Sequence, residues 1–514
     1  MESTREPAAP IAELDEDAAQ LAALGYDYDT TFKRDMTFWG NVALGFTYLS
    51  PVVAVYTMFS VSLGQAGPPM FWSLAIAGLG QFFVALVFGE IVSNYPVAGG
   101  VYPWSRRLWG RKWAWMNGWV YIVAMFATIA SVSYGAGPFL GTLFDAEAGV
   151  NTTVVCALVM LALALFFNLS GTRILNTAAM VGLICELGGA VVVGAWLLIT
   201  ARQHDVSVLF DAFGAGDGKS YFIAFSAAAL IGIFQYYGFE ACGDVAEEIK
   251  NPGRQIPKAM RWTIYIGGFA AMFIAFALIL AVPNYEAVVA DFNAGSTNDP
   301  LTMVLISAFG PIGYKFVVAI VLISFLSCLI SLQAAVSRLT YSMSRDGILP
   351  FSKKLVRVNE RTGVPSTALI LAAVVPASII LLSLLLPDAL VTIISFSSVG
   401  IYIAFQMVVL AALRARILGW KPAGSFRLRG WAFPVNILAL AWGIIGITAI
   451  AWPRTPEAPW YVNYIVLLTA LGVLGVGALY MWLKKPYLVG SAPSGDATSQ
   501  INTIAARPRE QVSR

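Results

Sequence analysis

Charged residues are scarce in this sequence. Lysine, arginine, aspartate and glutamate together make up 12% of its 514 residues, whereas about 25% is usual in soluble globular proteins. Hydrophobic residues make up 58%. A chain this long cannot cover so much apolar surface in water, so we expect much of its surface to face lipid. The formal net charge of +3 is also too small to indicate a basic surface that binds nucleic acid.

Histidine and cysteine are scarce as well. The one histidine, His204, lies in a polar connector, which excludes a histidine proton relay inside the membrane and a Ser-His-Asp triad within a helix bundle. The cysteines occur singly in apolar runs, without a CxxC motif or a metal-ligand cluster. They are Cys156, Cys185, Cys242 and Cys328. We therefore expect the cysteines to pack, and we expect neither a metal site nor a cofactor.

The N-terminal segment contains no apolar run and is acidic, as at 13–17. A cleavable signal peptide needs a basic start followed by an apolar stretch of about 7–15 residues, so none is expected. We predict cytoplasmic tails over 1–36 and 486–514. The first membrane-spanning helix must then direct insertion itself.

Twelve apolar runs are long enough to cross a bilayer, which takes about 20 residues of α-helix. The runs are long and do not alternate, which excludes barrel strands. We predict an all-α membrane protein with spans at 38–63, 70–93, 113–138, 152–169, 176–200, 221–243, 262–283, 315–341, 366–386, 389–413, 432–452 and 460–483.

Lysine and arginine are distributed unevenly among the loops between these spans. One set of alternate loops carries nineteen of them, whereas the other set carries Arg202, Lys219 and Arg454, with Lys315 at a helix edge. Because basic loops stay in the cytoplasm, we predict a multi-pass protein of the cell (plasma) membrane with both termini inside. The nineteen are Arg106, Arg107, Arg111, Lys112, Arg173, Lys250, Arg254, Lys258, Arg261, Arg345, Lys353, Lys354, Arg357, Arg361, Arg414, Arg416, Lys421, Arg427 and Arg429.

Spans one and six differ from the others. The first carries GFTYLSP at 45–51, and the sixth carries GIFQYYGFE at 232–240, each near the middle of its span. Proline lacks the amide that a continuous helix needs, and glutamate is costly at bilayer depth. Either segment alone would fit an ordinary kink. Together they indicate two broken helices that line a transport site near the membrane midplane.

These two spans open two successive blocks of five helices, at 37–200 and 221–415. Since five is an odd number, the second block must be inserted upside down relative to the first. Helices 11 and 12 follow at 430–485. Inverted blocks whose first helices are interrupted are typical of secondary transporters.

Three segments that lie beside the predicted spans are similar to the signature segments of a known transporter family. They read GEIVSNYPVAGGVYPW at 89–104, AEEIKNPGRQIPKA at 246–259 and SRLTYSMSRDGILP at 337–350. In this order they resemble the signature segments of the amino acid–polyamine–organocation transporters, and within them those of the amino acid/choline group, over roughly residues 35–485. The resemblance implies a five-plus-five inverted repeat with two extra C-terminal helices. It also implies alternating access, with the substrate held by the broken first and sixth helices.

We therefore expect a secondary active transporter, not an enzyme, that moves amino acids or related small amines. Coupling to H+ or Na+ and exchange all stay open, and so do choline, ethanolamine, a polyamine or γ-aminobutyrate as alternative substrates. We expect a monomer or homodimer in the lipid bilayer. A membrane-embedded enzyme would need a nucleophile–base pair or metal ligands at membrane depth, and a channel would need rings of residues from several subunits. The sequence contains no Gly-x-x-x-x-Gly-Lys-Ser/Thr loop for transport driven by ATP.

The two breaks offer backbone groups that could hold a zwitterion. Amides at a half-helix N-terminus favour an anion, and carbonyls at the other break favour a cation. Aromatic rings nearby could attract an ammonium group, and the resemblance places a lid at Phe234, or else at Tyr236. The candidate substrate-binding residues are Thr47, Tyr48, Leu49, Ser50, Met125, Thr128, Phe234, Gln235, Tyr236, Tyr237, Gly238 and Glu240, with Ser397, Ser398 and Tyr402 as further candidates in span ten.

Glu186 and Glu240 lie inside predicted spans, where a carboxylate costs at least ~2.5–3.5 kcal/mol on insertion scales. Glu186 stands near the point where several members of the family carry a lysine. It could bind a cation or carry the proton, with Ser327 and Ser331 opposite, or it could be neutral and structural. Glu240 could bind the substrate amine, carry a proton or cap the second half-helix.

Glu247 and Glu248 lie at the predicted cytoplasmic end of span six, close in sequence to Lys250 and other basic residues. Together with Lys250 they are candidates for a cytoplasmic gate whose ion pairs break and re-form. The alternative is a solvated charge cluster that sets the topology, because exposed ion pairs are individually weak.

Overall fold

The computed structural model describes residue 34 and residues 36–216, 220–295, 299–385, 389–454, 458–490 and 492–497. The acidic segment at 13–17, Lys219 and most of the two predicted tails lie outside these ranges. The main helices in chain order are α2 (Phe38–Leu49), α3 (Pro51–Ala66), α4 (Phe71–Asn94), α5 (Val101–Leu108), α6 (Arg111–Leu143), α7 (Val150–Leu169), α8 (Thr172–Trp196), α9 (Tyr221–Ala228), α10 (Leu230–Gln235), α11 (Ala241–Asp244), α12 (Pro252–Ala281), α13 (Tyr285–Asn293), α14 (Pro300–Arg345), α15 (Ser352–Leu355), α16 (Ser366–Leu382), α17 (Ala389–Ile417), α18 (Ala432–Ala451), α19 (Trp460–Asn463) and α20 (Ile465–Lys484).

The prediction of an all-α membrane protein is confirmed. Eleven helices in the described ranges are long and apolar enough to cross a bilayer. The remaining predicted span, 221–243, is divided into α9, α10 and α11, and its apolar part is Tyr221–Gln235. Within the described residues the backbone pairs in β fashion only at an isolated bridge between Met36 and Ile249.

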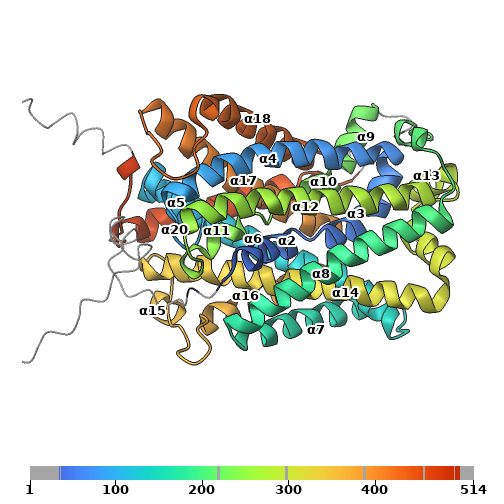
Figure 1. Ribbon diagram of the computed structural model, residues 1–514, viewed down its shortest axis with the longest axis horizontal. Helices are drawn as coiled ribbons and strands as arrows, with labels where there is room; N and C mark the ends of the chain where they lie inside the picture. Colours follow the sequence, from blue (N-terminus) through green and yellow to red (C-terminus); the bar gives the residue numbers. More distant parts are fainter. Residues whose placement is uncertain are drawn as a thin grey trace, which may run out of the picture.

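The long helices run side by side along one direction (Figure 1). At one end lie α5, α11 and α15, and at the opposite end lies α13. We name these the α5 end and the α13 end. The basic α5, with Arg106 and Arg107 in its last turn, belongs to the first of them. The loop charges therefore predict that the α5 end faces the cytoplasm.

Both predicted interruptions occur. Ser50 adopts a left-handed conformation with φ 43° between α2 and α3, and Pro51 begins the second half-helix, where a missing amide is tolerated. In the other span, α10 ends at Gln235 and α11 begins at Ala241. Between them Gly238 has φ +121°, a conformation that favours glycine.

Two of the predicted spans begin well inside their helices. Helix α12 begins at Pro252, where the predicted span began at 262, and α14 begins at Pro300, where the span began at 315. Hydropathy marks only the apolar part of a helix, and the first turns of α12 carry Arg254 and Lys258. Helix α14 also contains a non-helical residue, Gly310, followed by Pro311, which separates its first segment from the long second one.

Candidate functional site

The two breaks touch each other inside the bundle. A Cβ added to Gly238 would lie 2.6 Å from the backbone nitrogen of Leu49 and 3.0 Å from the ring of Tyr48. The backbone of the second break therefore rests directly on the first, and any side chain at Gly238 would push them apart. Leu49 also packs against Gly267 of α12, where an added Cβ would meet its Cδ2 at 2.6 Å.

Glu186 of α8 binds the break between α2 and α3. Its Oε1 accepts hydrogen bonds from the Ser50 hydroxyl at 2.6 Å and from the Val52 amide at 2.9 Å. The side chain is fully buried, and its Oε2 has no hydrogen-bond partner in the described part of the chain. A buried oxygen of this kind is a candidate ligand for a proton or a cation.

Hydroxyl groups of α14 face the same break. The hydroxyls of Thr47 and Ser331 are 2.7 Å apart, and the Cys328 thiol donates to the carbonyl oxygen of Tyr48 at 3.3 Å. Ser327 instead donates to the carbonyl of Ser324 within its own helix at 3.0 Å. Of the two predicted serines, the structure thus brings Ser331 into contact with the break.

Gly182 allows α8 to pack closely against Thr47 of α2 and Ser327 of α14. An added Cβ at Gly182 would lie 2.4 Å from the Cβ of Ser327 and 2.9 Å from Cγ2 of Thr47. The glycine precedes Glu186 by one helical turn. The absence of a side chain at this position lets Glu186 reach the first break.

Glu240 is bound at the second break. Its Oε2 accepts from the amide of Gly238 at 2.7 Å, and its Oε1 accepts from the hydroxyl of Tyr121 at 2.9 Å. The sequence analysis missed Tyr121, although it precedes the predicted candidate Met125 by four residues and so shares its helix face. Glu240 therefore connects the sixth span to α6.

The aromatic side chains around the second break divide into two pairs. The rings of Phe234 and Tyr237 meet edge to face with their centroids 5.6 Å apart. Phe239 instead packs between Phe88 and Phe405, at centroid distances of 5.9 and 5.7 Å.

Like Phe239, Tyr236 points away from the pair formed by Phe234 and Tyr237. Its ring and hydroxyl would lie 2.8–2.9 Å from a Cβ added to Gly78 of α4, and its hydroxyl 3.0 Å from one added to Gly268 of α12. The structure therefore groups Phe234 with Tyr237 and places Tyr236 between α4 and α12.

Polar side chains of α6 and α17 surround Tyr237. Thr128, Ser397 and Ser398 lie beside its hydroxyl, and that hydroxyl has no hydrogen-bond partner of good geometry in the described residues. The Tyr402 hydroxyl donates to the carbonyl of Ile233 at 3.4 Å. These predicted residues of spans three and ten thus lie beside the sixth span.

Gln235 and Met125 complete the set of predicted candidates. Both are fully buried. The amide nitrogen and oxygen of the Gln235 side chain lack hydrogen-bond partners among the described residues. A buried amide with both groups unmatched is available to a polar ligand.

Asp244 is a third buried carboxyl group, which the sequence analysis missed. It follows Glu240 by one helical turn, is 0% exposed, and has no hydrogen-bond partner for either carboxyl oxygen within the described ranges. Its Oδ1 would lie 2.4 Å from a Cβ added to Gly100. The predicted span ended one residue before it, at 243, so it was not counted among the intramembrane carboxyl groups.

The predicted gate residues form ion pairs with α14. Glu247 pairs with Arg345 at 3.2 Å and accepts the amide of Ala98 at 3.3 Å, while Glu248 pairs with Arg338 at 3.0 Å. Both glutamates are buried, whereas Lys250 is exposed. The two glutamates therefore pair with arginines about 90–100 residues away in sequence, which folding alone brings near, and not with Lys250, the third predicted gate residue.

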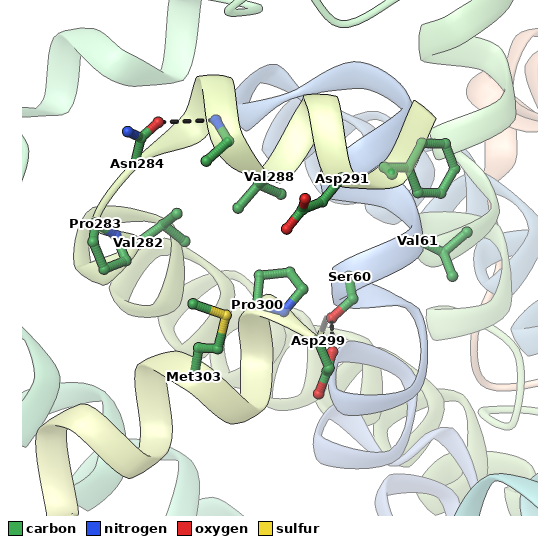
Figure 2. A pocket seen from close by; sticks show the side chains of 12 residues that line it. Ser60, Val61, Val282, Pro283, Asn284, Val288, Asp291, Asp299, Pro300 and Met303 are labelled. Carbon is green, nitrogen blue, oxygen red and sulfur yellow. Dashed lines mark hydrogen bonds between the residues drawn. The ribbon is translucent and has the colours of Figure 1, made fainter. Parts of the chain in front are cut away.

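A cavity of about 300 Å³ opens at the α13 end, between α3, α13 and the beginning of α14 (Figure 2). Asp299 caps α14 by accepting the Thr302 amide at 3.0 Å and also accepts the Ser60 hydroxyl. The carboxyl group of Asp291 points toward the middle of this cavity in Figure 2. Two carboxyl groups thus line an opening at the end opposite the basic loops.

Comparison with known proteins identifies relatives along most of the chain. Amino-acid permease BAT1 of Arabidopsis thaliana is 25% identical over 498 residues, which cover 91% of this chain and 95% of the relative. The serine/threonine exchanger SteT of Bacillus subtilis is 27% identical over 372 residues, or 71% of this chain and 79% of the relative. A choline transporter of Saccharomyces cerevisiae is 23% identical over 489 residues, or 91% and 84%.

The amino acid permease family matches residues 37–472, which include every helix from α2 to α18. This range contains both breaks and the buried carboxyl groups of Glu186, Glu240 and Asp244. The chain therefore belongs to the amino acid permease family, within the amino acid–polyamine–organocation superfamily, and is a membrane transporter of amino acids or related amines rather than an enzyme.

Proposed function

We propose that this chain is a secondary active transporter of an amino acid or a related small amine, and that the substrate binds where its two broken helices meet. The observation that carries the proposal is the approach of Gly238 to Leu49, with Glu186 bound at one break and Glu240 at the other. Irregular backbone at membrane depth is tolerated where it lines a cavity or is buried in protein. Half-helix ends at such a break bind substrate and coupling ion.

Glu186 is the proposed coupling residue. Its Oε2 is buried without a partner in the described residues, and the Thr47 and Ser331 hydroxyls lie at the same break. A proton on Oε2, or a sodium ion held there with hydroxyl and carbonyl oxygens, would remove the cost of the buried charge. Exchange without net ion flux is the remaining mode, and it is the mode named for the serine/threonine exchanger.

The ion pairs at the α5 end are the proposed cytoplasmic gate. Glu247–Arg345 and Glu248–Arg338 join the segment after α11 to α14, so the sixth span cannot move away from α14 while they hold. In an inverted five-plus-five repeat, one block would rock against the other and break these pairs. The charge bias of the loops supports a cytoplasmic position for this gate and for both termini.

Reconstituted transport tests the proposal. Purified protein in proteoliposomes should accumulate a radiolabelled amino acid or amine under an imposed proton or sodium gradient, and an ionophore should abolish the accumulation. A panel of substrates at two pH values, with and without sodium, identifies the driving ion. Accumulation that ignores every gradient would refute ion coupling and leave exchange, and the absence of any uptake or exchange would refute the proposed function.

A further inference from the structure

We infer that the central site accepts an amine that carries no carboxylate group, because Glu186 and Ser50 occupy the amides at the N-terminus of α3 that would hold one. The inference rests on the proposed function and narrows its substrate class. A zwitterionic amino acid needs an anion site as well as a cation site. In a broken-helix transporter the anion site is the N-terminus of a half-helix.

The N-terminus of α3 has no amide left for a substrate. Pro51 has no N–H group. The Val52 amide donates to Oε1 of Glu186 at 2.9 Å, and the Val53 amide donates to the Ser50 hydroxyl oxygen at 3.4 Å. The Ala54 amide donates to the Ser50 carbonyl at 3.1 Å. A substrate carboxylate could bind here only by displacing Glu186.

At the second break Glu240 occupies the amide of Gly238. The Gly238 amide donates to Oε2 of Glu240 at 2.7 Å. The Ala241 amide donates to the carbonyl of Gly238 at 3.1 Å, and the Gly243 amide donates to the carbonyl of Glu240 at 2.7 Å. A carboxylate approaching the Gly238 amide would therefore meet the carboxyl group of Glu240.

The charges around the breaks favour a cation. Glu186, Glu240 and Asp244 are all 0% exposed. Arg338 lies beside Asp244, and its Nε donates to Glu248 at 3.0 Å. Like charges at this depth repel strongly because the dielectric constant is low. Oε2 of Glu186 and both oxygens of Asp244, which lack partners in the described residues, remain as acceptors for ammonium hydrogens.

Glu186 blocks the amide in either protonation state. Oε1 accepts both hydrogen bonds, so a proton on Oε2 would leave these contacts in place. Neutralising Glu186 would lessen the repulsion of a substrate carboxylate without freeing the Val52 amide for it. The preference for an amine therefore follows from occupancy of the α3 N-terminus as well as from charge.

Equilibrium binding to the purified full-length protein tests the inference without any ion gradient. The probes are matched pairs that differ by one carboxylate: ethanolamine and serine, putrescine and ornithine, agmatine and arginine. For the pair that binds best, we expect the amine to bind at least about tenfold more tightly than its amino acid, a difference of about 1.4 kcal/mol. Equal or tighter binding of the amino acid would overturn the inference and leave the proposed function intact, as would failure of all six to bind while another amino acid is bound or transported. Failure of the whole panel of amino acids and amines to bind or be transported would refute both.

A second test of the inference removes the carboxyl group of Glu186, which blocks the Val52 amide. In Glu186→Ala the Val52 amide becomes available, so the ratio of amine to amino acid affinity should fall by about tenfold or more. Glu286→Gln is the charge-matched control, because Glu286 is exposed on α13 and the substitution changes the net charge equally. An unchanged ratio in a folded, monodisperse Glu186→Ala protein would show that Glu186 does not exclude carboxylates.

Discussion

Ser50 donates its hydroxyl to Oε1 of Glu186 at 2.6 Å, across 136 residues of sequence. Ser50 is also the left-handed residue at which the first span breaks. The contact therefore ties the conformation of the break to a titratable group on a different helix. A change in the charge of Glu186, or of its partners, is a direct route from ion binding to the shape of the substrate site.

Replacing Glu186 by glutamine should uncouple transport from the ion gradient. Glutamine preserves the acceptor for Ser50 and Val52, but it can neither titrate nor hold a cation by charge. We expect exchange of substrate across proteoliposomes to continue while gradient-driven accumulation falls to near the level seen with an ionophore. Unchanged proton or sodium dependence in this variant would return Glu186 to a purely structural role.

Truncating Phe234 should weaken the transport of every substrate. The edge-to-face contact with Tyr237 orders both rings at the second break, and an aromatic contact with an ammonium is worth ~0.5–2 kcal/mol. We expect KM in Phe234→Ala to rise by roughly 2- to 30-fold. Tyr236→Phe is the matched control, because Tyr236 lies between α4 and α12, and its uptake kinetics should remain those of the native protein. Uptake kinetics equal to those of the native protein in Phe234→Ala would show that Phe234 does not contribute to substrate binding.

Breaking the pair between Glu247 and Arg345 should open the α5 end. Removing one partner of a buried ion pair costs about 3–5 kcal/mol, so Glu247→Gln should shift the population away from the closed gate. The measurement is the labelling rate of a cysteine introduced near Ser342, in a background without native cysteines. We expect faster labelling than in the same background with Glu247 present.

The charge-swapped double variant, Glu247→Arg with Arg345→Glu, supplies the control. It restores opposite charges to the two positions, so labelling should slow again if the pair itself holds the gate. Equal labelling in all three proteins would favour the solvated charge cluster over the gate.

Adding a methyl group at Gly238 should separate the two breaks. Its φ of +121° and the 2.6 Å approach to the Leu49 nitrogen leave no room for a Cβ, and strain of this kind costs about 1–3 kcal/mol. We expect Gly238→Ala to lower both the melting temperature in detergent and the uptake rate. Gly472→Ala is the matched control, because no atom lies within 4 Å of its added Cβ on α20, and alanine should stabilise that helix by about 0.5–1 kcal/mol. A native melting temperature for Gly238→Ala would show that the breaks can move apart freely.

Much of the architecture could be read from the sequence because its causes are local. Membrane spans follow from runs of apolar residues, and a break follows from Pro51 in one span or from Gly238 and Glu240 in the other. The family motifs are contiguous segments and needed no tertiary information. Helix ends were less accurate, as at α12 and α14, because polar turns beyond the lipid carry no hydropathy signal.

The partners at the site depended on contacts between distant segments. Sequence placed Glu186 and Glu240 inside the membrane, but only tertiary packing brought Glu186 to Ser50 and Tyr121 to Glu240. Likewise, the sequence grouped Lys250 with the two gate glutamates, whereas the fold pairs these glutamates with Arg345 and Arg338.

The direction of side chains at the second break was decided by the tertiary structure as well. Inside an irregular segment no helical period predicts which ring faces which neighbour, so the separation of Phe234 and Tyr237 from Tyr236 and Phe239 could not be derived beforehand. The sequence by itself thus determined that this is a membrane transporter with two broken helices. The tertiary structure decided which groups meet at the breaks, because those contacts join helices that are far apart along the chain.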